Sequence, residues 1–349
     1  MVMRSFVLCL VTVSALGGAL FAQAPASPNR TLTAVPGIKV GHLTLAQRPT
    51  GCTVILVEGG ATAGVDVRGA APATRETDLL KPGNIVQIAH AIVLSGGSAF
   101  GLDAAGGVMR YLEEKRIGFE FGSSHVPIVP AASLFDLAVG DGTIRPAADC
   151  GYRAARTAST APVQEGSVGA GAGATIGKSA GASRAMKGGI GTAAIALPGG
   201  LIVAALVATN GFGDVVDPAT GSIVAGVRAA DGRSFADVRI LLRRGDVRFA
   251  TPGQNTTLGV IATNAVLTKT DATRVSEMAH DGFARAIVPV HTPVDGDTIF
   301  TLATGARPGA ADVGVIGALA ADVMAEAIVR AARQATGVTG YPALRDLKR

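Results

Sequence analysis

Residues 253–264 read GQNTTLGVIATN and join an arginine-rich connector to an apolar run. The connector extends from Asp231 to Phe249, and we expect it to be exposed. The apolar run Leu258–Ala262 is typical of a buried strand, and Thr256 and Thr257 precede it. Taken alone, the stretch predicts only the start of a strand, because threonine is a common strand former.

A second turn that leads into a strand lies at residues 291–298, HTPVDGDT. Asp295 and Asp297 are two residues apart, so in extended backbone they lie on the same face. Two carboxylates this close repel each other unless a cation or a shared proton compensates. The free α-ammonium of a new chain start would be such a cation. Without one, the DGD sequence is typical of a solvated turn.

Strands and helices alternate on both sides of these two segments. We expect a helix that begins with a capping box at Thr268–Asp271 and continues with apolar residues every three to four positions to Ile287. Further expected elements are the strands 53–57, 91–94 and 298–303, a hairpin formed by 193–197 and 201–208, and a long helix over 310–332. The alternation predicts an α/β fold, and the lack of a convincing linker predicts a single domain over residues 25–349.

The first 24 residues have the pattern of a signal peptide. A basic start is followed by the apolar run Phe6–Phe21 and by the small-residue sequence Ala22-Gln23-Ala24. The alternative is an uncleaved membrane anchor, but the run is shorter than the roughly 20 residues that a spanning helix needs. We therefore expect a periplasmic or secreted protein with no stable membrane insertion. In the exported chain, Cys52 and Cys150 either form a disulfide or remain as two buried thiols.

Composition and motif spacing argue against several classes of function. With 48% hydrophobic and 16% charged residues, the chain is not intrinsically disordered. The net charge of +5 comes from scattered lysines and arginines, so we expect no nucleic-acid partner. Gly177-Lys178-Ser179 resembles part of a phosphate loop, but Ala172 occupies a position that requires glycine. The five histidines lack metal-ligand spacing, so we predict neither a metal nor a cofactor, and each histidine is expected to be structural.

The sequence resembles the family of DmpA-type L-aminopeptidase/D-esterases, which includes β-aminopeptidases and endo-type 6-aminohexanoate-oligomer hydrolases. The resemblance extends over nearly all of the mature chain. In addition to the two segments described above, it rests on residues 37–41 (GIKVG), 69–78 (GAAPATRETD), 94–102 (LSGGSAFGL), 129–132 (VPAA), 169–171 (GAG) and 187–191 (KGGIG). The NTT and DGDT segments are closest to the nylon-oligomer hydrolase branch.

This resemblance implies a four-layer αββα sandwich that cleaves itself between Asn255 and Thr256. The products would be an α chain of residues 25–255 and a β chain of residues 256–349. Thr256 would then be the nucleophile, and the further catalytic residues would be Asp295, Asp297, Lys178 and Asn210. The resemblance also implies a homo-oligomer, a tetramer of αβ units. Phe135 departs from the family pattern, which has a tyrosine near the nucleophile.

The expected chemistry is that of an N-terminal-nucleophile amidohydrolase. A threonine hydroxyl is a weak nucleophile and needs an adjacent base. The freed α-amine of Thr256 has a pKa near ~8 and can act as that base, oriented by Asp295 or Asp297. The Asn210 amide would donate to the oxyanion, and Lys178 would either keep the amine neutral or position Thr256.

We expect an aminopeptidase that releases N-terminal residues from short peptides, amides or esters. The alternatives are an endo-type hydrolase of 6-aminohexanoate oligomers and a catalytically silent periplasmic binding protein. A nucleotide-binding enzyme that uses the glycine-rich segment is disfavoured, because its motifs fail.

Overall fold

The structure is a computed structural model that describes residues 29–247, 249 and 255–347. The predicted signal peptide, residues 1–24, lies outside the described residues, as do Gly253 and Gln254. Within the described part of the chain, no helix is long and apolar enough to cross a membrane.

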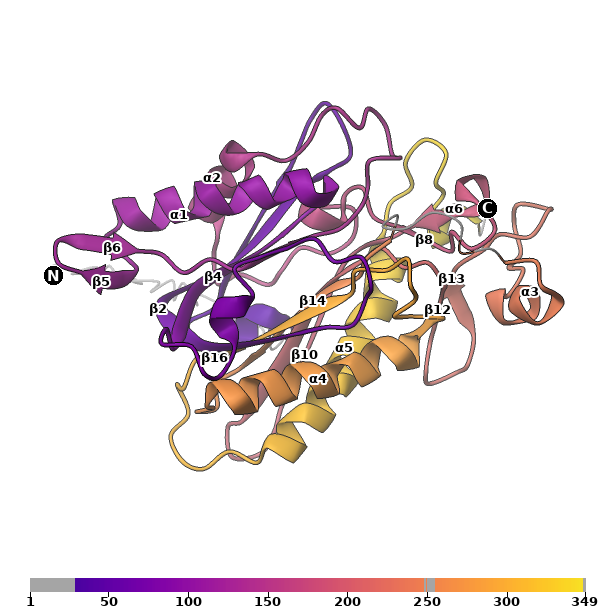
Figure 1. The fold of residues 1–349 in the computed structure, drawn as a ribbon. Helices are drawn as coiled ribbons and strands as arrows, with labels where there is room; N and C mark the ends of the chain where they lie inside the picture. Colours follow the sequence, from indigo (N-terminus) through magenta and orange to yellow (C-terminus); the bar gives the residue numbers. More distant parts are fainter. Residues whose placement is uncertain (1–28, 248, 250–254, 348–349) are drawn as a thin grey trace, which may run out of the picture.

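A nine-stranded mixed sheet organises the molecule (Figure 1). Its strand order is β10-β11-β14-β16-β2-β4-β7-β3, and β1 pairs with β2 outside this path. The neighbours β14 and β16 are parallel, as are β4 and β7, and the other pairs are antiparallel. The strands are β1 (Lys39–Thr44), β2 (Gly51–Val67), β3 (Thr74–Arg75), β4 (Ile88–Ser95), β7 (Ala131–Ser133), β10 (Gly189–Ala196), β11 (Ile202–Thr209), β14 (Leu258–Thr263) and β16 (Thr298–Ala303).

Strand β2 is 17 residues long and connects two layers of the fold. Its first part, Cys52–Leu56, pairs with β4, and its last part, Thr62–Val67, pairs with β16. The register with β4 is irregular between Leu56 and Ala61. One long strand therefore belongs first to the β1–β4 layer and then to the layer of β10, β11, β14 and β16.

Three hydrophobic cores separate four layers. Side chains on alternate faces of a strand enter different cores, because successive side chains point in opposite directions. In β14, Val260 enters a central core that it shares with Ile55 of β2, whereas Ile261 enters a core covered by helices α4 (Lys269–Ala286) and α5 (Val313–Gln334). In β2, Val54 enters the third core, under α1 (Ala104–Glu114) and α2 (Ala148–Thr157). This order of layers confirms the four-layer αββα sandwich.

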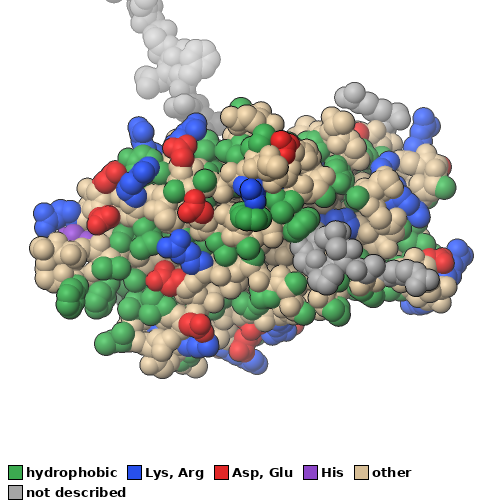
Figure 2. All heavy atoms as spheres, turned by 45° about the horizontal axis from the view of Figure 1, so that its top comes forward, with side chains coloured by type: hydrophobic (Ala, Val, Ile, Leu, Met, Phe, Trp, Pro, Cys, Tyr) green, Lys and Arg blue, Asp and Glu red, His purple; other side chains and the backbone are tan. Residues whose placement is uncertain are grey.

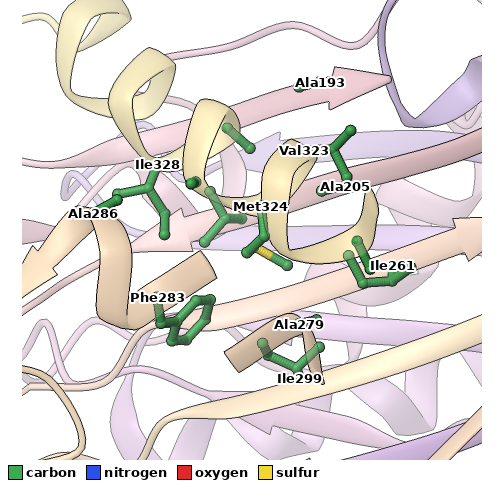
Figure 3. Close-up of a cluster of buried hydrophobic side chains, with 14 of the residues drawn as sticks. Ala193, Ala205, Ile261, Ala279, Phe283, Ala286, Ile299, Val323, Met324 and Ile328 are labelled. Carbon is green, nitrogen blue, oxygen red and sulfur yellow. The ribbon is translucent and has the colours of Figure 1, made fainter. Parts of the chain in front are cut away.

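In the α4–α5 core, side chains of both helices pack against the sheet (Figure 3). Phe283 of α4 and Met324 of α5 point toward Ile261 and Ile299 of the sheet, and all four side chains are fully buried. Glycine permits the closest helix–sheet approach: a Cβ atom at Gly191 of β10 would overlap the Ala327 carbonyl oxygen of α5. The small residues of this chain thus let helix and strand backbones lie close together.

Smaller elements surround the sandwich. The remaining strands are β5 (Phe119–Phe121), β6 (Ser124–Val126), β8 (Thr175–Ile176), β9 (Met186–Lys187), β12 (Asp214–Val216), β13 (Ile223–Ala225) and β15 (Ile287–Val288). The remaining helices are α3 (Val238–Arg244), α6 (Leu344–Leu347) and the 3-10 turns Leu32–Ala34, Asp78–Leu80, Ser98–Asp103, Gly169–Gly171 and Ala182–Arg184.

The connector predicted over Asp231–Phe249 is more ordered than its charge suggested. It contains α3, and Val238 of this helix is fully buried in a small cluster with Val227 and Leu241. Asp237 caps the helix by accepting a hydrogen bond from Arg239 N. The expectation of an entirely exposed segment was wrong, because Arg243 and Arg244 of α3 are exposed whereas Val238 and Leu241 are buried.

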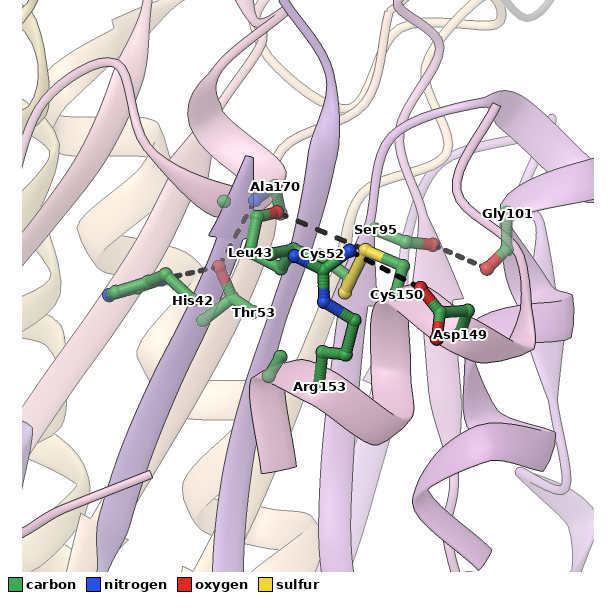
Figure 4. The surroundings of a disulfide bond; sticks show 12 residues. His42, Leu43, Cys52, Thr53, Ser95, Gly101, Asp149, Cys150, Arg153 and Ala170 are labelled. Atoms are coloured by element: carbon green, nitrogen blue, oxygen red, sulfur yellow. Dashed lines mark hydrogen bonds and ion pairs between the residues drawn. A yellow bond between two sulfur atoms is a disulfide. The ribbon is translucent and has the colours of Figure 1, made fainter. Parts of the chain in front are cut away.

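Cys52 of β2 and Cys150 of α2 form a disulfide with a Cα–Cα distance of 6.2 Å (Figure 4). Both residues belong to the α1–α2 core. Of the two states left open by the sequence, the structure has the disulfide. It ties the outer helix layer to the sheet.

The surface mixes charges of both signs. On the face shown in Figure 2, lysine and arginine side chains alternate with acidic and apolar ones. This face carries no continuous basic stripe of the kind that binds nucleic acid.

Candidate active site

The parallel pairing of β14 with β16 brings the two sequence-predicted segments together. Leu258 pairs with Thr298, and Thr298 N donates to Thr257 O at 3.2 Å. Because parallel strands start at the same edge of a sheet, Thr256 and Asp297 become neighbours there. Thr257 N donates to Asp297 Oδ1 at 2.7 Å, which fixes the carboxylate beside the strand start.

Thr256 lies in a tight, buried position. The residue is 3% exposed, and a Cβ atom at Gly296 would lie 2.8 Å from Thr256 Oγ1. The Thr256 N–H donates to Asn210 O at 3.1 Å. The φ angle of Thr256 is 143°, a region that β-branched residues rarely adopt. The peptide unit between Asn255 and Thr256 is therefore strained.

Asn210 follows β11 and connects Thr256 to Lys178. Its Oδ1 accepts from Lys178 Nζ at 2.9 Å and from Thr175 N at 2.8 Å. Its Nδ2 donates to Phe135 O at 3.0 Å. An amide nitrogen carries two hydrogens, so one Asn210 N–H is used to hold Phe135 and the other can serve a ligand.

Lys178 lies in the turn after β8, and its N–H donates to Phe212 O at 3.0 Å. Its Nζ also donates to Asn210 O at 3.3 Å. Burial lowers the pKa of the Lys178 ammonium to about 7, although the carboxylates of Asp295, Asp136 and Asp297 act in the opposite direction. Near neutral pH this amine therefore exists in both protonation states and can accept or deliver a proton.

Asp295 and Asp297 point into the same site but are held differently. Burial and then the charge of Asp297 raise the pKa of Asp295 to about 7. Thr292 opposes this shift by donating to Asp295 Oδ2 from both its N–H and its hydroxyl. Asp297 accepts from Thr257 N and, through Oδ2, from His291 N at 3.1 Å and from His291 Nδ1 at 2.9 Å.

His291 is the site residue that the sequence alone did not identify. Its ring stacks on Phe283 at a centroid distance of 5.9 Å and meets His280 edge-on at 4.7 Å. Its φ angle is 54°, so both ring and backbone are constrained. Its Nδ1 contacts Asp297, and the expectation that each histidine is structural stays a prediction for His291. Its place four residues before Asp295 was the available signal.

The scissile bond predicted between Asn255 and Thr256 is buried. Asn255 is 2% exposed, and its Nδ2 lies 3.5 Å from Val294 O. Its Oδ1 is buried without a hydrogen-bond partner in the described part of the chain.

Phe135 follows β7, and its side chain lines a small cavity together with Lys178.

The structure brings all of the predicted site residues together through contacts or charge interactions. These residues are Thr256, Asp295, Asp297, Lys178 and Asn210. Among the described residues, no group of His, Cys, Asp and Glu side chains has the arrangement of a metal site.

Comparisons with known proteins place this geometry among the peptidases. The model of peptidase family S58 matches residues 30–344. An uncharacterized aminopeptidase of Mycobacterium tuberculosis is 43% identical over 344 residues, which cover 91% of this chain and 97% of the relative. A 6-aminohexanoate-oligomer endohydrolase of Kocuria sp. is 31% identical over 320 residues, which cover 85% of this chain and 84% of the relative.

Two solved structures share the fold. The L-aminopeptidase D-Ala-esterase/amidase of Ochrobactrum anthropi, described as a variant of the Ntn hydrolase fold, superposes with a TM-score of 0.65 at 21% identity over 92% of each chain. A Burkholderia sp. β-aminopeptidase superposes with a TM-score of 0.62 at 24% identity over 87% of this chain and 86% of that one.

Proposed function

The chain belongs to peptidase family S58 and is an amide-bond hydrolase, and we propose that it cleaves itself between Asn255 and Thr256 to become an N-terminal-nucleophile aminopeptidase. The observation that carries this proposal is the strained, buried Thr256 beside Asn210 and Asp297. A residue held at an unfavourable φ costs on the order of 1–3 kcal/mol, and such strain is concentrated at functional sites. Cleavage of the Asn255–Thr256 bond would relieve it.

Self-cleavage needs a nucleophile, a base and water. The Thr256 hydroxyl gives up its proton and attacks the Asn255 carbonyl carbon. The bond to the Thr256 nitrogen breaks as this nitrogen gains a proton, and an ester joins Asn255 to Thr256 Oγ1. Water then hydrolyses this ester to a carboxylate on Asn255 and a free hydroxyl on Thr256. Lys178 is suited to remove the hydroxyl proton, because its lowered pKa leaves part of the amine neutral near pH 7.

The freed α-amine then provides the base for substrate hydrolysis. It lies beside Asn210 O, which accepts from the same nitrogen in the single chain. Asp297 stays oriented by Thr257 N and His291, and Asp295 lies on the same turn. The second Asn210 N–H is available to an oxyanion, an interaction typically worth about 3–4 kcal/mol of barrier.

The two products would remain one folded unit. Strands β14 and β16 follow the cut, yet they lie between β11 and β2, which precede it. Separating the two chains would break two full strand interfaces and expose the α4–α5 core.

The proposed substrates are short peptides, amides or esters from which an N-terminal residue is released. The relative at 43% identity that is named an aminopeptidase supports this choice. The endohydrolase relative at 31% identity supports 6-aminohexanoate oligomers as the second candidate.

The apolar N-terminal run and the Cys52–Cys150 disulfide support export to the periplasm or beyond, since disulfides persist in oxidising compartments. A homo-oligomer of αβ units is part of the same proposal.

The test is denaturing electrophoresis with N-terminal sequencing of the purified protein. We expect two chains, the second beginning at Thr256. Thr256→Ala should remain a single, inactive chain, whereas Thr256→Ser should still be cleaved. The same proteins are assayed with L-, D- and β-alanyl p-nitroanilides and with 6-aminohexanoate oligomers. An intact wild-type chain that hydrolyses amides would refute the self-cleavage mechanism, and a cleaved chain without turnover would favour the silent binding protein.

A further inference from the structure

Lys178 lines the smaller of two adjoining cavities. The first, of about 80 Å³, is lined by Phe135, Asp136, Ala138, Val139, Thr175, Lys178, Gly181, Ala182 and Tyr341. The second, of about 1140 Å³, is lined by Pro49, Val139, Gly140, Arg228, the segment 337–342 and Asp346. Val139 and Tyr341 line both cavities, so the two lie next to each other.

The C-terminal segment 337–346 forms one wall of the larger cavity, and it is firmly attached. Lys187 N of β9 donates to Pro342 O at 2.9 Å, and Val338 and Tyr341 form a β-bridge closed by two hydrogen bonds. The Lys187 ammonium is fully buried and donates to the carbonyls of Gly171, Ala174 and Gly188. The wall is thus anchored to the core beside β8, the strand that precedes Lys178.

Arg228 brings a positive charge to the larger cavity. Its Nη2 donates to Ser183 O at 2.5 Å, and its Nε is buried with no acceptor among the described residues. The other charged residue of this cavity, Asp346, already accepts from Ala343 N at 2.8 Å. Within the described part of the chain, Arg228 forms no ion pair. A guanidinium with spare, partly desolvated N–H groups is well suited to bind a carboxylate.

We propose that the larger cavity binds the C-terminal end of the substrate and that Arg228 pairs with its free carboxylate. The preferred substrates are then short peptides or amino-acid oligomers with an unblocked C-terminus, rather than their amides. This inference rests on the proposed function and adds a specificity-determining residue to it.

The size of the cavities fits this assignment. Pockets for small ligands commonly measure roughly 300–1000 Å³, so the larger cavity has room for more than one residue. The small cavity is lined by Lys178 and Phe135 and shares Val139 and Tyr341 with the larger one. A short substrate would extend from Lys178 past Tyr341 toward Arg228.

The test compares L-alanyl-L-alanine with L-alanyl-L-alanine amide, which differ only in the terminal charge. We expect wild-type kcat/KM to be about tenfold or more higher for the free acid, chiefly through KM, since a charge pair of about 1.4 kcal/mol gives this factor. Arg228→Gln should bring the acid-to-amide ratio close to one. Arg228→Lys, which keeps the charge, should retain part of the preference.

Arg233→Gln is the matched control, because Arg233 is exposed, is close to Arg228 in the sequence and lines neither cavity. It should leave the ratio at the wild-type value. A ratio that is the same in Arg228→Gln and in the wild type would overturn this inference alone. If the wild type cleaves neither dipeptide substrate nor any alanyl p-nitroanilide, both the proposed function and this inference fail.

Discussion

Asp295 and Asp297 are separated by one glycine, but their environments differ. Asp297 receives three hydrogen bonds, from Thr257 N, His291 N and His291 Nδ1. Asp295 is buried, receives its hydrogen bonds from Thr292 alone and has an Oδ1 without a partner among the described residues. The two carboxyls therefore differ in their surroundings: Asp297 is held by three hydrogen bonds, whereas burial and the charge of Asp297 raise the pKa of Asp295.

The raised pKa of Asp295 should make the stability of the protein depend on pH. The pKa of Asp295 is raised to about 7, whereas a carboxyl in the unfolded chain titrates near ~3.9. The folded state thus holds this proton more tightly, so the stabilisation is complete below about pH 4 and is lost as the pH rises to about 7. Asp295→Asn does not titrate. In a Thr256→Ala background, the melting temperature of Asp295→Asn minus that of its parent should increase between pH 4 and pH 8.

The control for that experiment is Asp281→Asn, an exposed change on α4. Its difference in melting temperature should stay flat over the same pH range. A flat curve for Asp295→Asn as well would contradict the buried, proton-holding carboxyl.

His291 should act on catalysis through Asp297. His291→Asn keeps a residue that tolerates the φ angle of 54°, but it removes the ring that donates to Asp297 Oδ2. Losing a hydrogen bond to a charged group costs about 1.5–3 kcal/mol, so we expect kcat to fall by roughly 10–100-fold.

Because His291 orients Asp297 and has no assigned substrate contact, KM should change little. Steady-state kinetics on an alanyl p-nitroanilide measures both constants. His125→Asn, on the peripheral strand β6, is the control. An unchanged kcat in His291→Asn would show that the contact with Asp297 is dispensable.

At the scale of single elements, two neighbouring glycines of α1 differ in how closely other atoms approach them. A Cβ atom at Gly106 would meet nothing within 4 Å, whereas one at Gly107 would overlap the Ala148 carbonyl oxygen of α2. Gly107 is thus a point of close contact between the two helices. Glycine at position 106 only weakens the helix.

This contrast gives a paired prediction. Gly106→Ala should raise the free energy of unfolding by up to about 1 kcal/mol, because alanine is the better helix former. Gly107→Ala should lower it, because α1 must move away from α2 and disturb the core beneath. Urea unfolding of both variants in one background measures the difference. Equal effects of the two substitutions would contradict the close α1–α2 approach.

Helix-scale expectations were met where the sequence carries a local signal. The capping box predicted at Thr268–Asp271 is present at the start of α4, with both reciprocal hydrogen bonds. The predicted hairpin is β10–β11. Helix α3 was missed because its short apolar side was obscured by five arginines in the surrounding segment.

At the scale of the whole molecule, the Cys52–Cys150 disulfide closes a long loop. The two residues are 98 positions apart, for which the chain-entropy model gives about 4–5 kcal/mol of stabilisation. Reduction should therefore lower the free energy of unfolding by about 2–5 kcal/mol, as measured by urea unfolding with and without dithiothreitol. The Cys52→Ala/Cys150→Ala double variant should be less stable than the wild type and insensitive to dithiothreitol. A wild type whose stability does not respond to reduction would contradict a stabilising bridge.

The sequence by itself determined most of the periodic elements. Through its resemblance to a family, it also predicted the candidate set Thr256, Asp295, Asp297, Lys178 and Asn210. These features depend on local propensity or on short motifs, and both can be recognised without knowing which strands pair.

The tertiary structure alone decided what those residues touch. The parallel pairing of β14 and β16, strands separated by helix α4 along the chain, places Thr256 against Gly296 and links Asp297 to His291. The disulfide and the cavity at Arg228 likewise join distant segments. Such contacts result from the burial of three cores between four layers, and a local pattern contains no information about which distant partner it will meet.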